Sequence, residues 1–422
     1  MSLLPACTTE AQLQWARPYV VSLPGSDVVY AQGRVGASCP HPQEAEVQLW
    51  DYATGTLCGV LHHPGGILRD MQWMPIKCGP TTHAAGVLAV AHDANESCAQ
   101  LWVVPAVPVG KETSSTASCC HWHWEQAALT LDHCRGASAL SWREPHQWEC
   151  SPPKQQHELL VGCADGRVHL CEVDCSAAGQ LTFEPLLSIH PNTSPVSALC
   201  WARCGCISSY FMVYYAQNTC LNIMDVEAPH QTCLSRKTKI TTSATSCDAS
   251  LGTSSFALCL SDLGNVQLVE LLKQGTWVPS FVSPENGDGG SRNGDAVCLA
   301  TDVSTGVHLL VGTTTGQLQR SPFHSGNTVS ASTSQTWSPQ TLLEVTCDLS
   351  SEEQPLHVDA PALGIPGSKA PIPECVAQDP TLAFLPPKAA ALQSVSSSRL
   401  HTAGVFAVCT LRGLLVMGVL PP

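Results

Sequence analysis

One short segment groups the residue types that bind metal ions most readily, Cys119-Cys120-His121-Trp122-His123. Zinc sites commonly combine Cys-x-x-Cys with a second pair of ligands at a fixed distance. The chain contains no Cys-x-x-Cys, and neither Cys204-Gly205-Cys206 nor the segment 171–175 supplies a second pair. We therefore expect no metal ion and interpret the segment as a loop that leads into an outer strand.

Motifs of the common catalytic sites are absent: the sequence has no Gly-x-Ser-x-Gly, no His-Glu-x-x-His and no glycine-rich phosphate loop. A Cys–His dyad stays open, but 23 cysteines and 17 histidines make any single pair uninformative. His62, His63 and His190 precede expected first strands, where a histidine can hydrogen-bond a turn aspartate of the same sheet; Asp93 and Asp165 stand at such turns. We expect no enzyme and no cofactor.

Composition favours short strands. Hydrophobic residues make up 44% of the 422 residues and charged residues only 13%, whereas long helices need more Glu, Lys and Arg on their wet faces. The net charge of −14 argues against direct binding of nucleic acid. Such binding needs clustered basic residues that neutralise phosphates. The densest basic cluster is Arg236, Lys237 and Lys239, which is ordinary for a strand-edge loop.

The cysteines favour a reducing compartment. Several lie in apolar segments, where Cys acts as a small buried hydrophobe: Cys58, Cys163, Cys200, Cys259, Cys298 and Cys409. Residues 1–9 have no basic region and no long apolar run, so we expect no secretory leader. No stretch approaches the roughly 20 apolar residues of a membrane span. These features indicate a reducing compartment, either the cytosol or the nucleus.

One pattern recurs along the chain: a strand that ends in an aromatic residue, an apolar strand of small residues, a tight polar turn and a strand that often ends in Trp. The residues that define it are Trp50, Asp51, Trp73, Asp93, Trp102, Trp142, Asp165, Gly166 and Trp201. A dipeptide such as Asp165-Gly166 supplies the positive φ that a tight hairpin turn requires. One such sheet cannot bury both of its faces alone, so the units must stack around an axis.

The pattern predicts an all-β, WD-repeat-like β-propeller of seven blades formed by the whole chain, 1–422. The strand triplets are expected near residues 12–51, 67–104, 137–173, 195–226, 240–271, 295–320 and 375–419. In the first triplet the middle strand is expected at 28–32. The last triplet lacks an outer strand, which residues 2–8 are expected to supply by joining the two ends of the chain.

Segments rich in Pro, Gly and Ser interrupt the triplets. They span 105–118, 145–156, 283–294, 321–338, 350–374 and 386–398. We expect surface loops there, some of which order on a partner.

Two stretches resemble a known family. Gln48-Leu49-Trp50, the run Gly66–Pro75 and the run Gly86–Ala91 follow one another in the order found in the WD-repeat subunit of transcription factor IIIC, which is about 110 kDa in animals. Residues 137–225 continue the likeness, so that it covers about half of the chain. It implies a nuclear, non-catalytic subunit of the factor that recognises transfer-RNA promoters and recruits RNA polymerase III.

The expected function is therefore a protein-interaction scaffold that meets DNA only through its complex. The alternative is a cytoplasmic WD-repeat adaptor that binds a linear peptide or a larger complex. Aromatic residues on loops commonly anchor interfaces. The candidate partner contacts are Trp122, Trp124, Trp148, Trp277 and Trp337.

Overall fold

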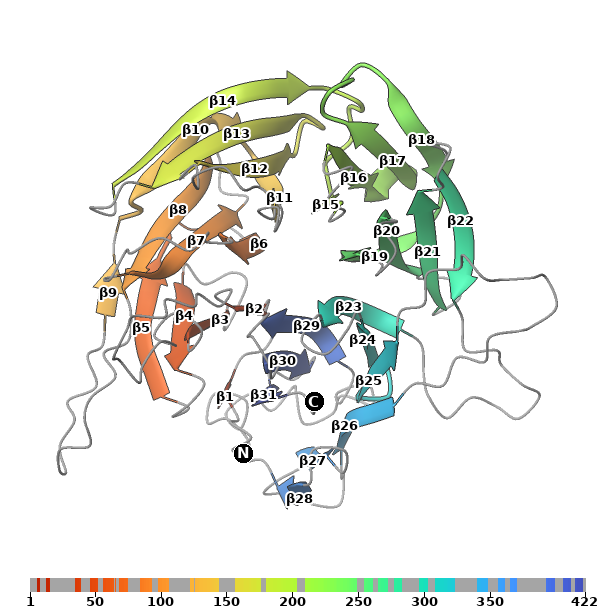
Figure 1. The fold of residues 1–422 in the computed structure, drawn as a ribbon. Helices are drawn as coiled ribbons and strands as arrows, with labels where there is room; N and C mark the ends of the chain where they lie inside the picture. The colour runs from red at the N-terminus through yellow and green to blue at the C-terminus, as the bar shows by residue number, and fades with distance from the viewer. Residues whose placement is uncertain are drawn as a thin grey trace, which may run out of the picture.

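Seven β-sheets form a ring in the computed structural model (Figure 1). The structure describes residues 6–7, 13–15, 35–38, 46–51, 56–63, 65, 68–74, 84–92, 98–105, 122–124, 126–143, 156–175, 180–202, 209–248, 254–260, 265–271, 277–282, 296–302, 308–322, 340–347, 356–360, 365–369, 392–398, 405–410 and 414–419. Within this part of the chain the only helical element is a short 3-10 turn. The expected all-β propeller of seven blades is confirmed.

The first four blades follow the chain in order. Blade 1 holds β2 (Leu13–Trp15), β3 (Val35–Ser38), β4 (Glu46–Asp51), β5 (Thr56–His62) and β9 (Trp122–Trp124). Blade 2 holds β6 (Leu68–Trp73), β7 (Ala84–His92), β8 (Cys98–Pro105) and β10 (Leu129–Arg135). Blade 3 holds β11 (Ala137–Trp142), β12 (Gln156–Cys163), β13 (Val168–Cys175) and β14 (Leu181–Ile189). Blade 4 holds β15 (Ala198–Trp201), β16 (Tyr210–Tyr215), the 3-10 turn η1 (Ala216–Asn218), β17 (Cys220–Asp225) and β18 (Thr232–Lys237).

The last three blades complete the ring. Blade 5 holds β19 (Ile240–Asp248), β20 (Ser254–Leu260), β21 (Asn265–Leu271) and β22 (Trp277–Val282). Blade 6 holds β23 (Ala296–Asp302), β24 (His308–Thr313), β25 (Gln317–Pro322), β26 (Gln340–Cys347), β27 (Leu356–Ala360) and β28 (Ile365–Lys369). Blade 7 holds β29 (Leu392–Ser398), β30 (Val405–Thr410), β31 (Leu414–Val419) and β1 (Ala6–Cys7).

The inner strands close a complete cycle. β2 contacts β6, and the contacts continue through β11, β15, β19, β23 and β29 back to β2. In blade 7 the outer strand comes from the other end of the chain, because β1 pairs antiparallel with β31 at Ala6–Leu415 and Cys7–Leu414. The expected join of the two chain ends is thereby confirmed.

The core lies between neighbouring blades. Small and β-branched residues such as Ala89, Val90 and Ala91 in β7 are fully buried, so that sheets on both sides approach closely. One apolar cluster joins blades 1 and 2, a second joins blades 2 and 3, and a third joins blades 3 and 4. Each sheet thus buries its apolar side chains against the neighbouring sheets, because a single sheet cannot bury both of its faces alone.

Several strands lie where loops were expected, and these expectations were wrong. β27 and β28 fall within 350–374, and β29 falls within 386–398. In β29 the apolar residues Leu392 and Val395 are buried, and the serines around them do not prevent pairing with β30. The middle strand expected at 28–32 lies outside the described residues; the strand between β2 and β4 is β3.

Blade 1 carries a strand that belongs to a later part of the chain. After β8 of blade 2 the chain returns to blade 1, where β9 pairs parallel with β5, and then goes back to blade 2 as its outer strand β10. Segments from both blades are therefore interleaved at their outer edge (Figure 1). Among the described residues no helix is long and apolar enough to cross a membrane.

Candidate functional site

Three tryptophans of the repeat occupy equivalent places at the ends of inner strands. Trp73 ends β6, Trp142 ends β11 and Trp201 ends β15, and all three are buried. Each belongs to the cluster that joins its own blade to the preceding one. These tryptophans therefore hold neighbouring blades together, which is a structural role.

Polar contacts reinforce the inner joints. The carboxylate of Asp70 in blade 2 accepts a hydrogen bond of 2.7 Å from the backbone N–H of Leu140 in blade 3. The indole N–H of Trp142 donates to the carbonyl of Gln72 at 3.2 Å. Burial raises the pKa of Asp70 to about 7, against hydrogen bonds from the backbone of Leu140 and Met71 that lower it. The joint thus holds a carboxyl group that titrates near neutral pH.

Blades 3 and 4 meet in a similar way. The hydroxyl of Ser141 accepts a hydrogen bond of 3.1 Å from the backbone N–H of Trp201. The guanidinium of Arg143 lies 5.2 Å from the centre of the Trp201 ring and forms an ion pair with Glu158. Arg143 is therefore held by a cation–π contact and a carboxylate within the propeller.

The turn Asp165-Gly166 has the geometry that its sequence predicts. Gly166 has φ +87°, and a Cβ there would lie 2.0 Å from the carbonyl oxygen of Asn192. His190 reaches this turn as expected, but its Nε2 lies 2.9 Å from the backbone carbonyl of Asp165. The Asp165 carboxylate instead accepts from the backbone N–H of Arg167. The histidine is therefore structural, with a main-chain partner in place of the expected side chain.

The remaining repeat residues are placed as follows. Trp102 is buried in β8 within the cluster between blades 1 and 2. Trp50 and Asp51 end β4, and Asp93 lies outside the described residues. His63 is buried and stacks on His92 at 5.0 Å, while His62 stacks on His123 at 6.1 Å.

The candidate partner contacts that the structure describes lie in two different blades, blade 1 and blade 5. Trp124 packs against the apolar cluster between blades 1 and 2, so it anchors β9. Trp122 begins β9, and Trp277 begins β22 at the outside of blade 5. Trp148 and Trp337 lie outside the described residues.

The outer edge of blade 3 is protected from further pairing. In β14 the register shifts beside Pro185, and Leu186 is the one large apolar side chain exposed in the described part of the chain. Proline and a bulge on an edge strand both prevent the addition of another strand.

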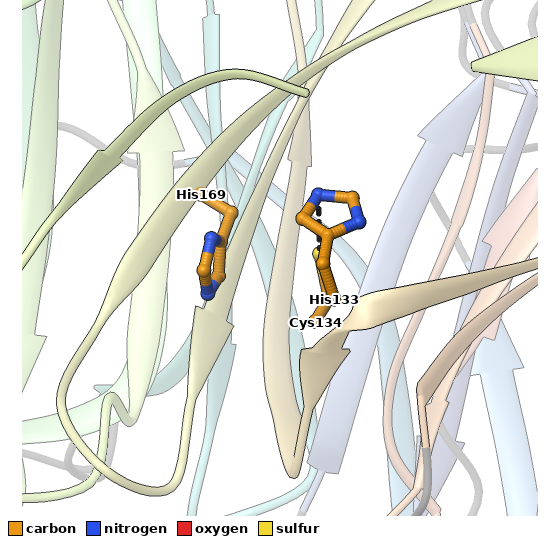
Figure 2. Close-up of side chains that lie close together, drawn as sticks. All are labelled: His133, Cys134 and His169. Carbon is orange, nitrogen blue, oxygen red and sulfur yellow. Dashed lines mark hydrogen bonds between the residues drawn. The ribbon is translucent and has the colours of Figure 1, made fainter. Parts of the chain in front are cut away.

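Sequence reasoning missed one cluster of titratable side chains. β10 of blade 2 carries His133 and Cys134, and β13 of blade 3 carries His169 and Cys171; Figure 2 shows the first three of these side chains. The two sulfur atoms are 3.8 Å apart, and His133 Nε2 lies 3.4 Å from Cys134 Sγ and 3.3 Å from Cys171 Sγ. The sequence signals, His-Cys and His-x-Cys, are more than 30 residues apart, and only the packing of the two blades unites them.

Burial controls the protonation of this cluster. The hydrogen bond with Cys171, followed by burial, raises the pKa of Cys134, and burial lowers the pKa of both His133 and His169. The rings of His133 and Phe183 stack at 5.2 Å on the outer side. Burial therefore disfavours both deprotonation of the Cys134 thiol and protonation of the two imidazoles.

The segment first considered for metal binding is only partly described. Residues 119–121 lie outside the described residues, whereas Trp122 and His123 are in β9. Among the described residues, His123 does not belong to any group of side chains that could hold a metal ion.

Comparison with known proteins identifies the fold. No family model matches the chain, and no curated protein matches its sequence. A chain of the crystal structure of a mitotic checkpoint complex aligns with a TM-score of 0.53 at 12% identity, over 100% of this chain and 91% of that chain. The WD40 domain of Toxoplasma gondii coronin aligns with a TM-score of 0.50 at 10% identity, over 100% and 89%. At such identities the likeness concerns the fold, and this chain has the fold of a WD40 β-propeller.

Proposed function

We propose that this chain is a non-catalytic protein-interaction scaffold, and specifically the WD-repeat subunit of transcription factor IIIC in the nucleus. One observation carries the proposal. Two of the stretches that resemble that family, Gly66–Pro75 and Gly86–Ala91, contain β6 and most of β7, which are adjacent strands of blade 2. These two stretches therefore belong to one structural unit of the ring.

A non-catalytic role is supported by the state of the thiols. Nucleophilic cysteines are exposed and have lowered pKa values. Cys134 and Cys163 are buried, and burial contributes to raising the pKa of both, that of Cys163 to about 12. Neither thiol is prepared to attack a substrate.

The charge supports an assembly role in place of direct contact with DNA. A net charge of −14 repels the phosphate backbone, so DNA would be bound by other subunits of the complex. The widened edges of blade 1, with β9, and of blade 6, with β27 and β28, are surfaces on which a protein partner can dock. We keep Trp122, Trp124, Trp148, Trp277 and Trp337 as candidate contacts.

The experiment is affinity purification of the tagged chain from its own cells, with mass spectrometry of the bound proteins and sequencing of bound chromatin. The proposal predicts the other subunits of transcription factor IIIC and enrichment of transfer-RNA genes. Tag alone and a Gly166→Val variant with a disrupted blade 3 are the controls.

Recovery of cytosolic partners alone, without transfer-RNA genes, would overturn the assignment to transcription factor IIIC. In that outcome the chain acts as a WD-repeat adaptor, and peptide binding becomes the question. A paired variant, Trp122→Ala with Trp277→Ala, tests two of the candidate contacts: we expect lower recovery of partners, with the melting temperature measured alongside to detect any loss of folding.

A further inference from the structure

The His–Cys cluster lies at a joint between two blades, where most other positions are apolar. Cys134 and Cys171 belong to the apolar cluster that joins blades 2 and 3, and both are fully buried. His169 is 7% exposed, whereas His133 is partly exposed at the outer side. Two imidazoles and two thiols therefore lie close together in an otherwise apolar interface between blades 2 and 3.

The local backbone explains how four such side chains meet. His169 and Cys171 are two residues apart in β13, so they point to the same face of blade 3. His133 and Cys134 are neighbours and would point to opposite faces of a regular strand. The register of β10 against β8 shifts between Leu131 and Arg135, and this irregularity allows both side chains to reach Cys171.

The distances match those of a tetrahedral zinc site. With Zn–S of about 2.3 Å and Zn–N of about 2.0 Å, tetrahedral geometry separates two sulfur ligands by about 3.8 Å and a sulfur from a nitrogen by about 3.5 Å. The corresponding separations here are 3.8 Å between the sulfur atoms and 3.3 and 3.4 Å from them to His133 Nε2. Three ligand atoms already form one face of the tetrahedron.

His169 is the nearest candidate for the fourth ligand. The ligand atoms of His133, Cys134 and His169 all lie within 4.8 Å of one another, but Cys171 does not belong to that group. The His169 ring must therefore move toward Cys171 Sγ before the four ligands complete a tetrahedron. Figure 2 shows the rings of His133 and His169 side by side, on strands of different blades.

We propose that Cys134, Cys171, His133 and His169 bind one Zn²⁺ ion that fastens blade 2 to blade 3. Two thiolates with two imidazoles are a ligand set that selects zinc. Four protein ligands leave no open coordination position, so the ion is structural. Each thiol releases its proton to solvent on binding, and the exposed side of His133 gives the ion its entry.

The test is the zinc content of the purified full-length chain, grown with zinc and measured by inductively coupled plasma mass spectrometry. We expect about one zinc per chain. Cys134→Ser and Cys171→Ser should each lower this content at least tenfold. Cys163→Ser is the matched control, because Cys163 is buried in the same apolar cluster but is not one of the four proposed ligands.

A second measurement covers the case in which a serine variant fails to fold. The wild-type chain loaded with Co²⁺ should show the strong visible absorption of a tetrahedral site and a thiolate-to-cobalt charge-transfer band, and Zn²⁺ should abolish both. A zinc content that is negligible in the wild type, or equal in Cys134→Ser and Cys163→Ser, would overturn the proposal.

Discussion

At the scale of single residues, Gly166 shows most directly how a residue type is fixed by its position. The backbone at Gly166 has a positive φ, which residues other than glycine disfavour. A Cβ added there would also lie 2.0 Å from the carbonyl oxygen of Asn192. We predict that Gly166→Ala lowers the free energy of unfolding by at least about 2 kcal/mol, the scale of strained backbone with an added clash. Urea unfolding followed by tryptophan fluorescence measures it.

The chain offers a matched control for this substitution. Gly65 also has a positive φ, +104°, but a Cβ there meets nothing within 4 Å. Gly65→Ala should therefore show the backbone strain without the clash and lose less stability. Equal losses for the two variants would mean that the contact with Asn192 has no effect.

Asp70 gives the propeller a pH dependence. Its pKa is raised in the folded chain from 3.8 to about 7, so between these values the folded state holds a proton that the unfolded state has lost. The contribution of Asp70 to stability is therefore greatest at low pH and declines as the pH rises to about 7. Asp70→Asn keeps an oxygen acceptor for the Leu140 N–H and cannot ionise.

We predict that Asp70→Asn gains stability relative to the wild type as the pH rises from 5 to 8. Unfolding midpoints at several pH values measure this trend, with Asp174→Asn, at an exposed position, as the control for loss of one charge. Parallel pH profiles for wild type and Asp70→Asn would show that the carboxyl group does not titrate in this range.

At the scale of elements, β9 is attached to blade 1 by a three-residue parallel ladder and by one large side chain. Trp124 packs into the cluster between blades 1 and 2. Trp124→Ala should weaken this attachment by about 1–2 kcal/mol, in proportion to the apolar area lost. Hydrogen exchange at Gly59, Val60 and Leu61, the partners of β9, should then become at least about tenfold faster.

His123→Ala is the control for this element. His123 lies between the two tryptophans of β9 but is exposed. Its ring stacks on His62 of β5 but does not enter the apolar cluster, so its removal should accelerate the exchange of β5 less than Trp124→Ala does. Equally fast exchange in both variants would indicate that β9 is held by its backbone ladder, independently of Trp124.

The elements also show how far sequence reasoning extends. Strands such as β7 and β17 could be predicted because their apolar residues lie between unambiguous turns. β29 could not, because its serines outnumber its apolar residues and only Leu392 and Val395 are shown to be buried. The return of β9 to blade 1 could not be predicted either, since pairing between distant strands leaves no local pattern. The cluster of His133 and Cys171 depends on the same kind of distant packing.

At the scale of the whole molecule, closure of the ring depends on β1. Its pairing with β31 spans two residue pairs and covers an edge that would otherwise expose unpaired backbone. We predict that deletion of residues 1–9 lowers the melting temperature by at least about 4 °C and promotes association of chains. Thermal unfolding with light scattering measures both effects.

A circular permutant is the control for the deletion. In it, residues 1–9 follow Pro422 through a Gly-Ser linker, so that the same strand reaches β31 from the other side of the seam. We expect the melting temperature to recover. A deletion without effect would show that the inner-strand cycle alone closes the ring.

The seam also sets the order in which the molecule can be made. Ala6 and Leu415 are about 400 residues apart in sequence, a long-range pairing of the kind that slows folding. During synthesis β1 leaves the ribosome before the other strands of the ring, and its partner β31 leaves after them. Until β29 and β31 have been made, the cycle between β23 and β2 stays open and β1 lacks its partner strand. The growing chain must therefore pass through an open arc, and the ring can close only after the last blade has been made.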